Sequence, residues 1–282
     1  MTTTKIFKGG LIALTSFGLI LTSCSKNADD STSVAENHSM AEQSNDELDA
    51  IGDEAETSIN NKLASFKNEN TGGILADSVH LTKIVSSDTV SVDIDFGTNG
   101  VTCKDGKIRK GKIKIKRVGN HFNQGSIRTL KTESYSVDGN TIEATRTVTF
   151  NGLQATNQHP SWTISAEHTI TLANGAGTIT GSTNRTREWS KGYEQNSLLN
   201  REDDEFILTG TSTGSKASGV SYEMEITTPL TIKVACHQIV SGVLVITPSG
   251  KLARTIDFGT GDCDGTATVT IGKTSKTVTI KK

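Results

Sequence analysis

The sequence predicts an all-β fold: an antiparallel meander of about 12–14 strands forming a curved sheet or a β-sandwich. Polar and apolar residues alternate at period two through most of residues 78–282. Turns rich in glycine, asparagine and aspartate separate these segments. The chain has only three prolines, which suits central strands because proline cannot donate a ladder hydrogen bond. We expect a signal peptide, an acidic linker and one short helix before this sheet.

Residues 1–23 have the pattern of a lipoprotein signal peptide. Two lysines precede an apolar stretch over 11–21, which is shorter than the roughly 20 residues a membrane-spanning helix needs. The following residues, Leu21 to Cys24, resemble a bacterial lipobox. We therefore predict lipidation of Cys24, which would anchor the mature protein stably to a membrane. An ordinary secretory signal with an accidental cysteine is the alternative.

Residues 24–77 are predicted to form an acidic tether. Residues 25–77 contain 12 acidic and 3 basic residues, whereas 78–282 contain 19 acidic and 24 basic residues, a formal charge of +5. Within the tether, segment 45–66 is predicted to be a short helix that docks on the sheet or frays, or else binds a partner. Its apolar residues recur at three- and four-residue steps: Leu48, Ile51, Ala55, Ile59, Leu63 and Phe66.

The remaining chain, 78–282, is predicted to be one antiparallel β domain. Ile113 and Ile115 alternate with Lys112 and Lys114, as in a half-buried strand. The same alternation recurs over 141–150, 161–172, 222–226 and 267–271. Short turns such as Asp138-Gly139-Asn140 predict hairpins, so sheet order should largely follow chain order.

Two related stretches, 95–106 and 257–265, combine Asp-Phe-Gly, a cysteine and a closing Asp-Gly. Their aspartates suggest a calcium loop, but neither has the closing glutamate that such a loop requires. We predict instead that the glycines supply positive-φ turns or bulges and that the aspartates accept hydrogen bonds from backbone amides. We therefore expect no metal and no cofactor.

Cys236 and Cys263 are predicted to form a disulfide, because the protein should lie outside the cytoplasm, where disulfides persist. If Ser249 and Gly250 form the tip of a hairpin, the register places Cys236 opposite Cys263, and a bulge at Gly259 or Gly261 would shift it by one residue. Two free thiols are the alternative. Cys103 is then left over, either free, buried as a small hydrophobe, or available for an intermolecular bond.

Two basic groups are candidate ligand-binding residues. One is a ribbon over 104–117 that includes Arg109, Lys112, Lys114 and Lys116 and that suits an anionic glycan. It also suits an ordinary solvated strand face. The other contains Arg185, Arg187 and Trp189, where arginine stacked on tryptophan suits a carbohydrate but equally suits a sheet corner.

The chain resembles a family of uncharacterised Bacteroidetes (flavobacterial-type) β-rich lipoproteins. The resemblance covers about residues 75–282 and rests on runs such as TRTVTFNG, NRTREWSKG, GVSYEMEITTPL and TIDFGTGDCDGTATVTI. It implies an extracytoplasmic, β-rich protein, a lipidated Cys24 and the C-terminal cysteine pair. It implies no established activity, substrate or catalytic residue.

We predict a lipid-anchored protein of the outer membrane, on the cell surface or the periplasmic face. A structural or binding module, not an enzyme, is the first hypothesis, with the membrane and a glycan or envelope protein as partners and no nucleic acid. A surface binder of an anionic glycan or polysaccharide is the alternative. A glycan-active enzyme is the second alternative, for which Asp203, Asp204 and Glu205 are the candidate acids. Because these acids are consecutive, they fit a solvated loop better.

Overall fold

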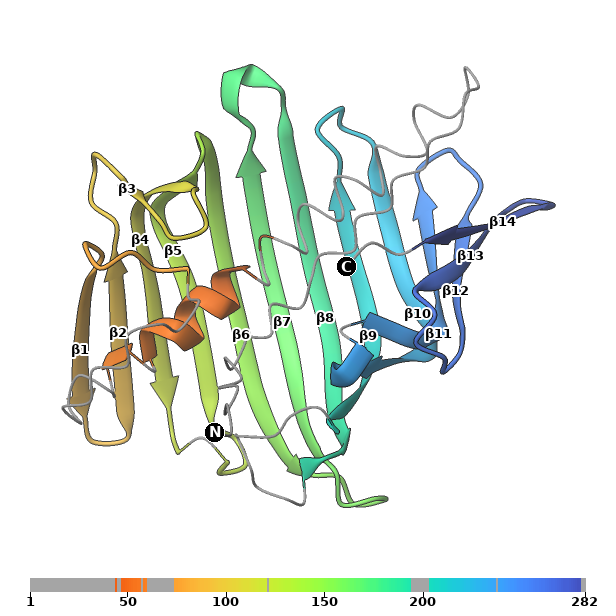
Figure 1. The fold of residues 1–282 in the computed structure, drawn as a ribbon, viewed down its shortest axis with the longest axis horizontal. Coiled ribbons are helices and arrows are strands. Elements are labelled where there is room, and N and C mark those ends of the chain that lie inside the picture. The colour runs from red at the N-terminus through yellow and green to blue at the C-terminus, as the bar shows by residue number, and fades with distance from the viewer. Residues whose placement is uncertain are drawn as a thin grey trace, which may run out of the picture.

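The computed structural model shows one curved antiparallel sheet that is not closed into a barrel (Figure 1). The structure describes residues 44, 47–56, 58–59, 74–120, 122–193, 203–236 and 238–279. The predicted signal peptide and Cys24 lie outside these residues. Across the described chain the sheet has 14 strands, and its order follows the chain, except that the short β3 pairs beside β4. The predicted all-β meander is therefore confirmed as a single curved sheet.

Every sequential pair of strands along this path is antiparallel. Asp138 and Gly139 join β5 to β6 with positive φ angles of 48° and 84°, the backbone that a two-residue hairpin requires. The strands are β1 His80–Ser86, β2 Thr89–Asp95, β3 Val101–Thr102, β4 Ile108–Val118, β5 Ile127–Val137, β6 Asn140–Leu153, β7 Pro160–Thr171, β8 Thr178–Lys191, β9 Glu205–Ser215, β10 Ser221–Lys233, β11 Gln238–Pro248, β12 Arg254–Thr260, β13 Thr266–Ile271 and β14 Thr274–Thr279.

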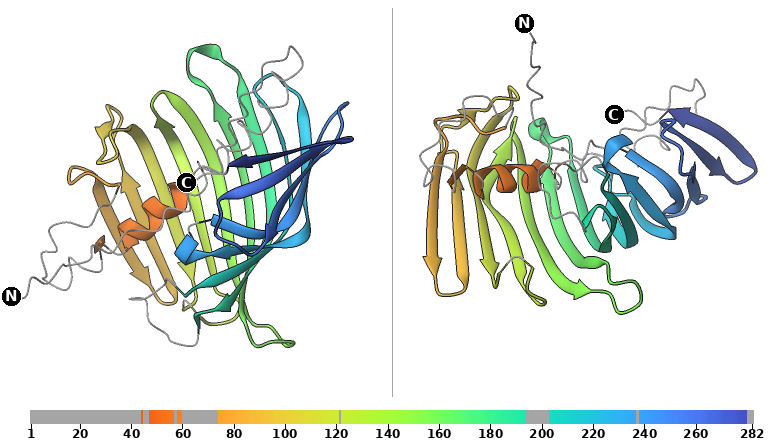
Figure 2. Two further views of the ribbon diagram at one scale, coloured as in Figure 1. Left: turned by 45° about the vertical axis from the view of Figure 1, so that its right-hand side comes forward. Right: turned by 60° about the horizontal axis from the view of Figure 1, so that its bottom comes forward.

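A helix lies across the concave face of the sheet. Its described residues are 47–56 and 58–59, and the sheet curves around it (Figures 1 and 2). We call the face that carries this helix the inner face and the opposite one the outer face. Within the predicted segment 45–66, Leu63 and Phe66 lie outside the described residues.

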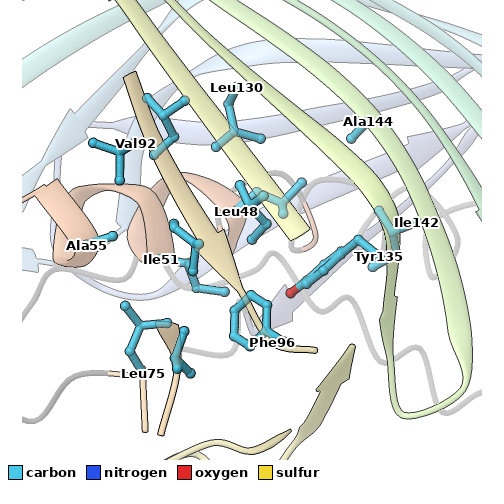
Figure 3. Packing of buried hydrophobic residues seen from close by; sticks show 14 of the residues in the cluster. Leu48, Ile51, Ala55, Leu75, Val92, Phe96, Leu130, Tyr135, Ile142 and Ala144 are labelled. Carbon is cyan, nitrogen blue, oxygen red and sulfur yellow. The ribbon is translucent and has the colours of Figure 1, made fainter. Parts of the chain in front are cut away.

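The helix supplies part of the first core. Leu48, Ile51 and Ala55 are buried and point towards sheet residues such as Val92 and Leu130 (Figure 3). Gly52, in the middle of the helix, allows a close approach: a Cβ there would lie 2.5 Å from Nη2 of Arg128. Glycine weakens a helix by roughly 0.5–1 kcal/mol relative to alanine, and here that cost permits tight packing on the sheet.

Acidic residues of the helix bind basic residues of the inner face. Asp49 pairs with Arg146 at 2.7 Å, and Asp53 pairs with Arg128 at 3.0 Å. Burial raises the pKa of Asp53 more than the nearby Arg128 lowers it. Glu54 accepts a hydrogen bond of 2.6 Å from the backbone N–H of Ile74, just before the sheet begins. The acidic composition of the tether therefore matches a basic sheet face.

The last five strands form a second core. In Figure 1, β14 runs across the view while β6 to β8 run up and down it, so the sheet turns sharply at this end. This core contains Tyr222, Met224, Leu230, Leu244, Ile246, Ile256, Phe258, Ala267, Val269 and Val278. Strong twist brings the side chains of neighbouring strands together here.

Cys236 and Cys263 form a disulfide beside this second core, with their Cα atoms 5.6 Å apart. The predicted pairing is confirmed, but the predicted register was wrong by one residue. Ile246 pairs with Arg254, because the β11–β12 connection is longer than a two-residue tip. A bulge that contains Gly259 then shifts the register once more, as expected at that glycine.

The two Asp-Phe-Gly stretches use turn chemistry. Asp95 Oδ1 accepts the N–H of Gly97 at 2.8 Å, and Asp257 Oδ1 accepts the N–H of Gly259 at 2.9 Å. Both glycines have positive φ angles, 70° and 81°. The predicted roles of these aspartates and glycines are confirmed. Cys103, from the first stretch, is a free thiol buried in the first core.

Candidate binding site

Arg109 is not available to a ligand, contrary to our prediction. Its side chain is 0 % exposed, lies under the helix, and donates to Asp105 at 2.7 and 2.8 Å and to Glu47. Burial alone would lower the pKa of Arg109, but the bonds to Asp105 and Glu47 raise it above its ordinary value. Arg109 therefore holds the helix on the sheet instead of facing solvent.

Three lysines of the predicted basic ribbon, Lys112, Lys114 and Lys116, lie on the outer face, whereas Lys107 pairs with Glu47 of the helix. Lys112 pairs with Asp95 at 2.9 Å and Lys114 pairs with Glu133 at 2.7 Å. Each hydrogen bond raises the pKa of its lysine. Lys116 is exposed on the same face. Because their partners neutralise much of the charge, these lysines form a mixed-charge strand face and not a strong anion site.

Arg185, Arg187 and Trp189 lie on the inner face of β8, so they do not join the lysines on the outer face of β4. The guanidinium of Arg187 lies 5.3 Å from the ring centre of Trp162 and 5.2 Å from that of Phe206. Trp189 stacks on Phe206 at 5.8 Å, and Arg185 donates to Ser212 at 3.1 Å. These contacts hold the three half-buried side chains in place, and the arrangement fits both of our interpretations, a carbohydrate contact and a sheet corner.

The acidic run 203–205 is also used structurally. Asp204 is 1 % exposed and accepts the Nε1–H of Trp189 at 3.1 Å. Glu205 pairs with Lys191 at 2.9 Å. Two of the three acids proposed for a hydrolase therefore have structural partners.

A different feature lies on the outer face, where the described residues form a hollowed surface. Two hollows of about 850 Å³ and 670 Å³ share Thr180, Thr213 and Gly214, so they form one trough open to solvent. We call it the outer trough. Its wall residues alternate along β6 with Ile142 and Ala144, which belong to the first core on the inner face. The walls therefore project outwards.

Two rows of side chains form the walls, and each row crosses the strands from partner to partner. One row consists of Glu143, Thr169, Thr180, Ser215 and Ser221. The other consists of Thr145, Glu167, Ser182, Thr213, Glu223 and Thr247. The floor between them is the backbone of the residues in between, including Gly181 and Gly214.

The walls of the trough are mostly polar, and Pro248 and the exposed Leu252 add apolar surface at the β11–β12 end. Nearly all of its wall side chains are hydroxyls or carboxylates, and the hydroxyls of Thr180 and Ser215 bond each other at 2.9 Å. Lys251 lies at one end, beside the β11–β12 connection. Adjacent strands are about 4.8 Å apart, so the row from β6 to β11 spans about 24 Å. Such a surface offers a repeated set of hydrogen-bonding groups along one direction.

The outer trough was not predicted from the sequence. The only signal was the outward set of threonines, serines and glutamates in each alternating strand. Which of them stand side by side depends on the register of six strands, and that register shifts at irregularities between β9 and β10 and between β10 and β11.

No protein-family model, no curated protein and no solved structure matches this chain. The resemblance to Bacteroidetes lipoproteins therefore stays a prediction.

Proposed function

We propose that this protein is a lipid-anchored outer-membrane protein whose sheet is a non-enzymatic binding module. The outer trough carries the proposal, because it is a long, polar, solvent-open surface on the face that the helix leaves free. The acidic tether then links the sheet to a lipidated Cys24, and its helix closes the inner face.

The sequence supports the anchor through the lipobox-like residues before Cys24. Within the described part of the chain, no helix is long and apolar enough to cross a membrane. Attachment through acyl chains on Cys24 supplies stable membrane binding without such a helix.

Binding fits the trough better than catalysis does. Glu143 and Glu167 are diagonal neighbours on β6 and β7, a relation that usually separates Cα atoms by about 7–8 Å. Inverting glycosidases hold two carboxyl groups roughly 6.5–9.5 Å apart, a separation that side chains on such neighbouring Cα atoms can reach, so we test this pair directly. Both side chains are exposed, however, whereas the acid of a glycosidase generally lies in an apolar pocket.

The anchor is tested by expressing the full chain and its Cys24→Ser variant in cells fed an alkyne-labelled palmitate. We expect label and membrane fractionation for the wild type and neither for the variant. A Cys24→Ser protein that still carries label would refute the anchor. Protease shaving of intact and lysed cells then assigns the sheet to the cell surface or to the periplasmic face.

Catalysis is tested by incubating the purified mature chain, carrying Cys24→Ser, with soluble polysaccharides and measuring new reducing ends. We expect no release. Release that disappears in both Glu143→Gln and Glu167→Gln would replace the binding module with a glycoside hydrolase.

A further inference from the structure

We propose that the outer trough binds an extended, uncharged polysaccharide. This inference rests on the proposed binding function and specifies its ligand class. It replaces the anionic glycan of the sequence prediction, because Arg109 is buried in ion pairs and Lys112 and Lys114 pair with acids.

The shape of the trough favours a polymer over a compact ligand. It runs across the strands from β6 to β11, about 24 Å at the usual strand spacing, and it is open to solvent. Each strand from β6 to β10 adds one wall residue to each row at that constant spacing, and β11 adds Thr247 to the second row. A chain of regularly repeated units can therefore meet the same kind of group at every step.

The chemistry of the walls favours hydroxyl-rich ligands. Serine and threonine hydroxyls both donate and accept, and a carboxylate accepts at up to four positions. Glu167 and Glu223 stand in one row with Ser182 and Thr213 between them. Neighbouring hydroxyls of a sugar can donate to such carboxylates, and bonds to an ionised acceptor are about twice as strong as neutral ones.

The charge of the walls disfavours an anionic polymer. Glu143, Glu167 and Glu223 line the trough, and among its described lining residues Lys251 is the one lysine or arginine. A polyanion would lie against three carboxylates. One exposed lysine, Lys131 of β5, stands opposite Thr145 at the β6 end, and Lys112 and Lys114 of β4 pair with Asp95 and Glu133. An uncharged polysaccharide avoids this repulsion and still uses the carboxylates as acceptors.

The test is affinity electrophoresis of the mature Cys24→Ser chain in gels that contain one polysaccharide each. The uncharged probes are mixed-linkage β-glucan, xyloglucan, galactomannan and amylopectin, and the anionic probes are polygalacturonate and heparin. We expect retardation by at least one uncharged probe and by neither anionic probe. Oligosaccharides cut from that probe should bind more tightly with length until the trough is filled.

Matched pairs of variants place the binding in the trough. Thr213→Arg puts a large side chain in one wall, whereas Thr211→Arg changes the same strand and face outside the trough. Likewise Glu223→Gln removes a wall carboxylate, and Glu225→Gln removes one two residues away on the same face. We expect at least a tenfold loss of affinity for Thr213→Arg, a several-fold loss for Glu223→Gln, and no change for either control. Circular dichroism and melting curves confirm that all four fold.

Three results would overturn the inference: retardation by the anionic probes alone, equal losses in the trough and control variants, or no retardation by any uncharged probe. The proposed function fails separately. A lipidated, membrane-bound chain that crosslinks to a protein through the trough would refute the polysaccharide but keep the binding module. A wild-type chain that carries no label would refute the anchor whatever the gels show.

Discussion

The first eight strands and the last five strands bury apolar surface in different ways. The first eight form a broad curve whose inner face is covered by a separate helix (Figure 2). The last five turn sharply, pack their own apolar side chains together, and carry the disulfide. In a gently curved sheet, a segment from elsewhere in the chain must cover the apolar side chains. In a strongly twisted sheet, the strands themselves bury more of these side chains against one another.

The two regions also differ in what fixes them. Ion pairs between the helix and the sheet orient the cover of the first region, with Arg109 completely buried among them. A covalent link between Cys236 and Cys263 holds the second region. The outer trough runs from β6 to β11 and so spans the junction between the two. Substitutions that destabilise one region therefore test whether the two regions unfold independently.

Arg109→Met should cause the largest loss of stability. It leaves Glu47 and Asp105 without their buried partner, and breaking one half of such a pair costs about 3–5 kcal/mol. Urea unfolding followed by circular dichroism measures the loss. Lys114→Met, which breaks an exposed pair with Glu133, is the control and should change little. Equal effects of both variants would contradict the structural role of Arg109.

Ile51→Ala should loosen the first region selectively. Ile51 is 0 % exposed in the helix, and such a truncation usually costs about 2–5 kcal/mol. Hydrogen exchange should increase in β2, β4 and β5 and stay unchanged in β10 to β12. Ile246 is 2 % exposed in the second core. Ile246→Ala should therefore increase hydrogen exchange in β10 to β12 and leave β2, β4 and β5 unchanged. If both variants raise exchange equally everywhere, the two cores unfold as one unit.

Replacing both Cys236 and Cys263 by serine should weaken the second region. The entropy of the closed loop predicts a loss of about 3 kcal/mol. We expect faster amide hydrogen exchange in β11 and β12, whereas the helix should stay as protected as in the wild type. An unchanged unfolding midpoint in the double variant would show that packing alone fixes this end.

Lowering the pH should destabilise the helix-covered region, and we expect this loss of stability to be the smallest of the predicted effects. Burial alone would raise the pKa of Asp105, but its bonds to Arg109 lower it overall. A carboxyl whose pKa is depressed by folding stabilises the protein above its unfolded pKa of about 3.9 and loses this contribution as the pH falls through the folded value. Burial raises the pKa of Asp53, so Asp53 contributes with the opposite sign.

Asp105→Asn should therefore be less stable than the wild type at pH 7 and should lose less stability on going to pH 2. Urea midpoints at a series of pH values measure this. If the urea midpoint of Asp105→Asn falls with pH as steeply as that of the wild type, other carboxyls dominate the loss of stability in acid.

The sequence alone was enough for the local features. Alternation in the strands and positive-φ pairs such as Asp138-Gly139 predict the meander, because both depend only on neighbours in the chain. Three- and four-residue steps identify the buried side of the helix, including Leu48 and Ile51. The disulfide followed from one hairpin even though the register was wrong by one residue, because both cysteines still meet at its open end.

Only the tertiary structure decided which distant residues meet. Arg109 reads as one member of a basic ribbon, yet it is buried because the helix, about 60 residues earlier, brings Glu47 over it. At Gly111 a Cβ would lie 2.1 Å from the carbonyl oxygen of Ser134, so a bulge there resets the register of β4 against β5. The outer trough likewise exists only because six strands align their outward residues. Alternation assigns each residue to a face, but the summed registers and the curvature of the sheet decide which of those residues become neighbours.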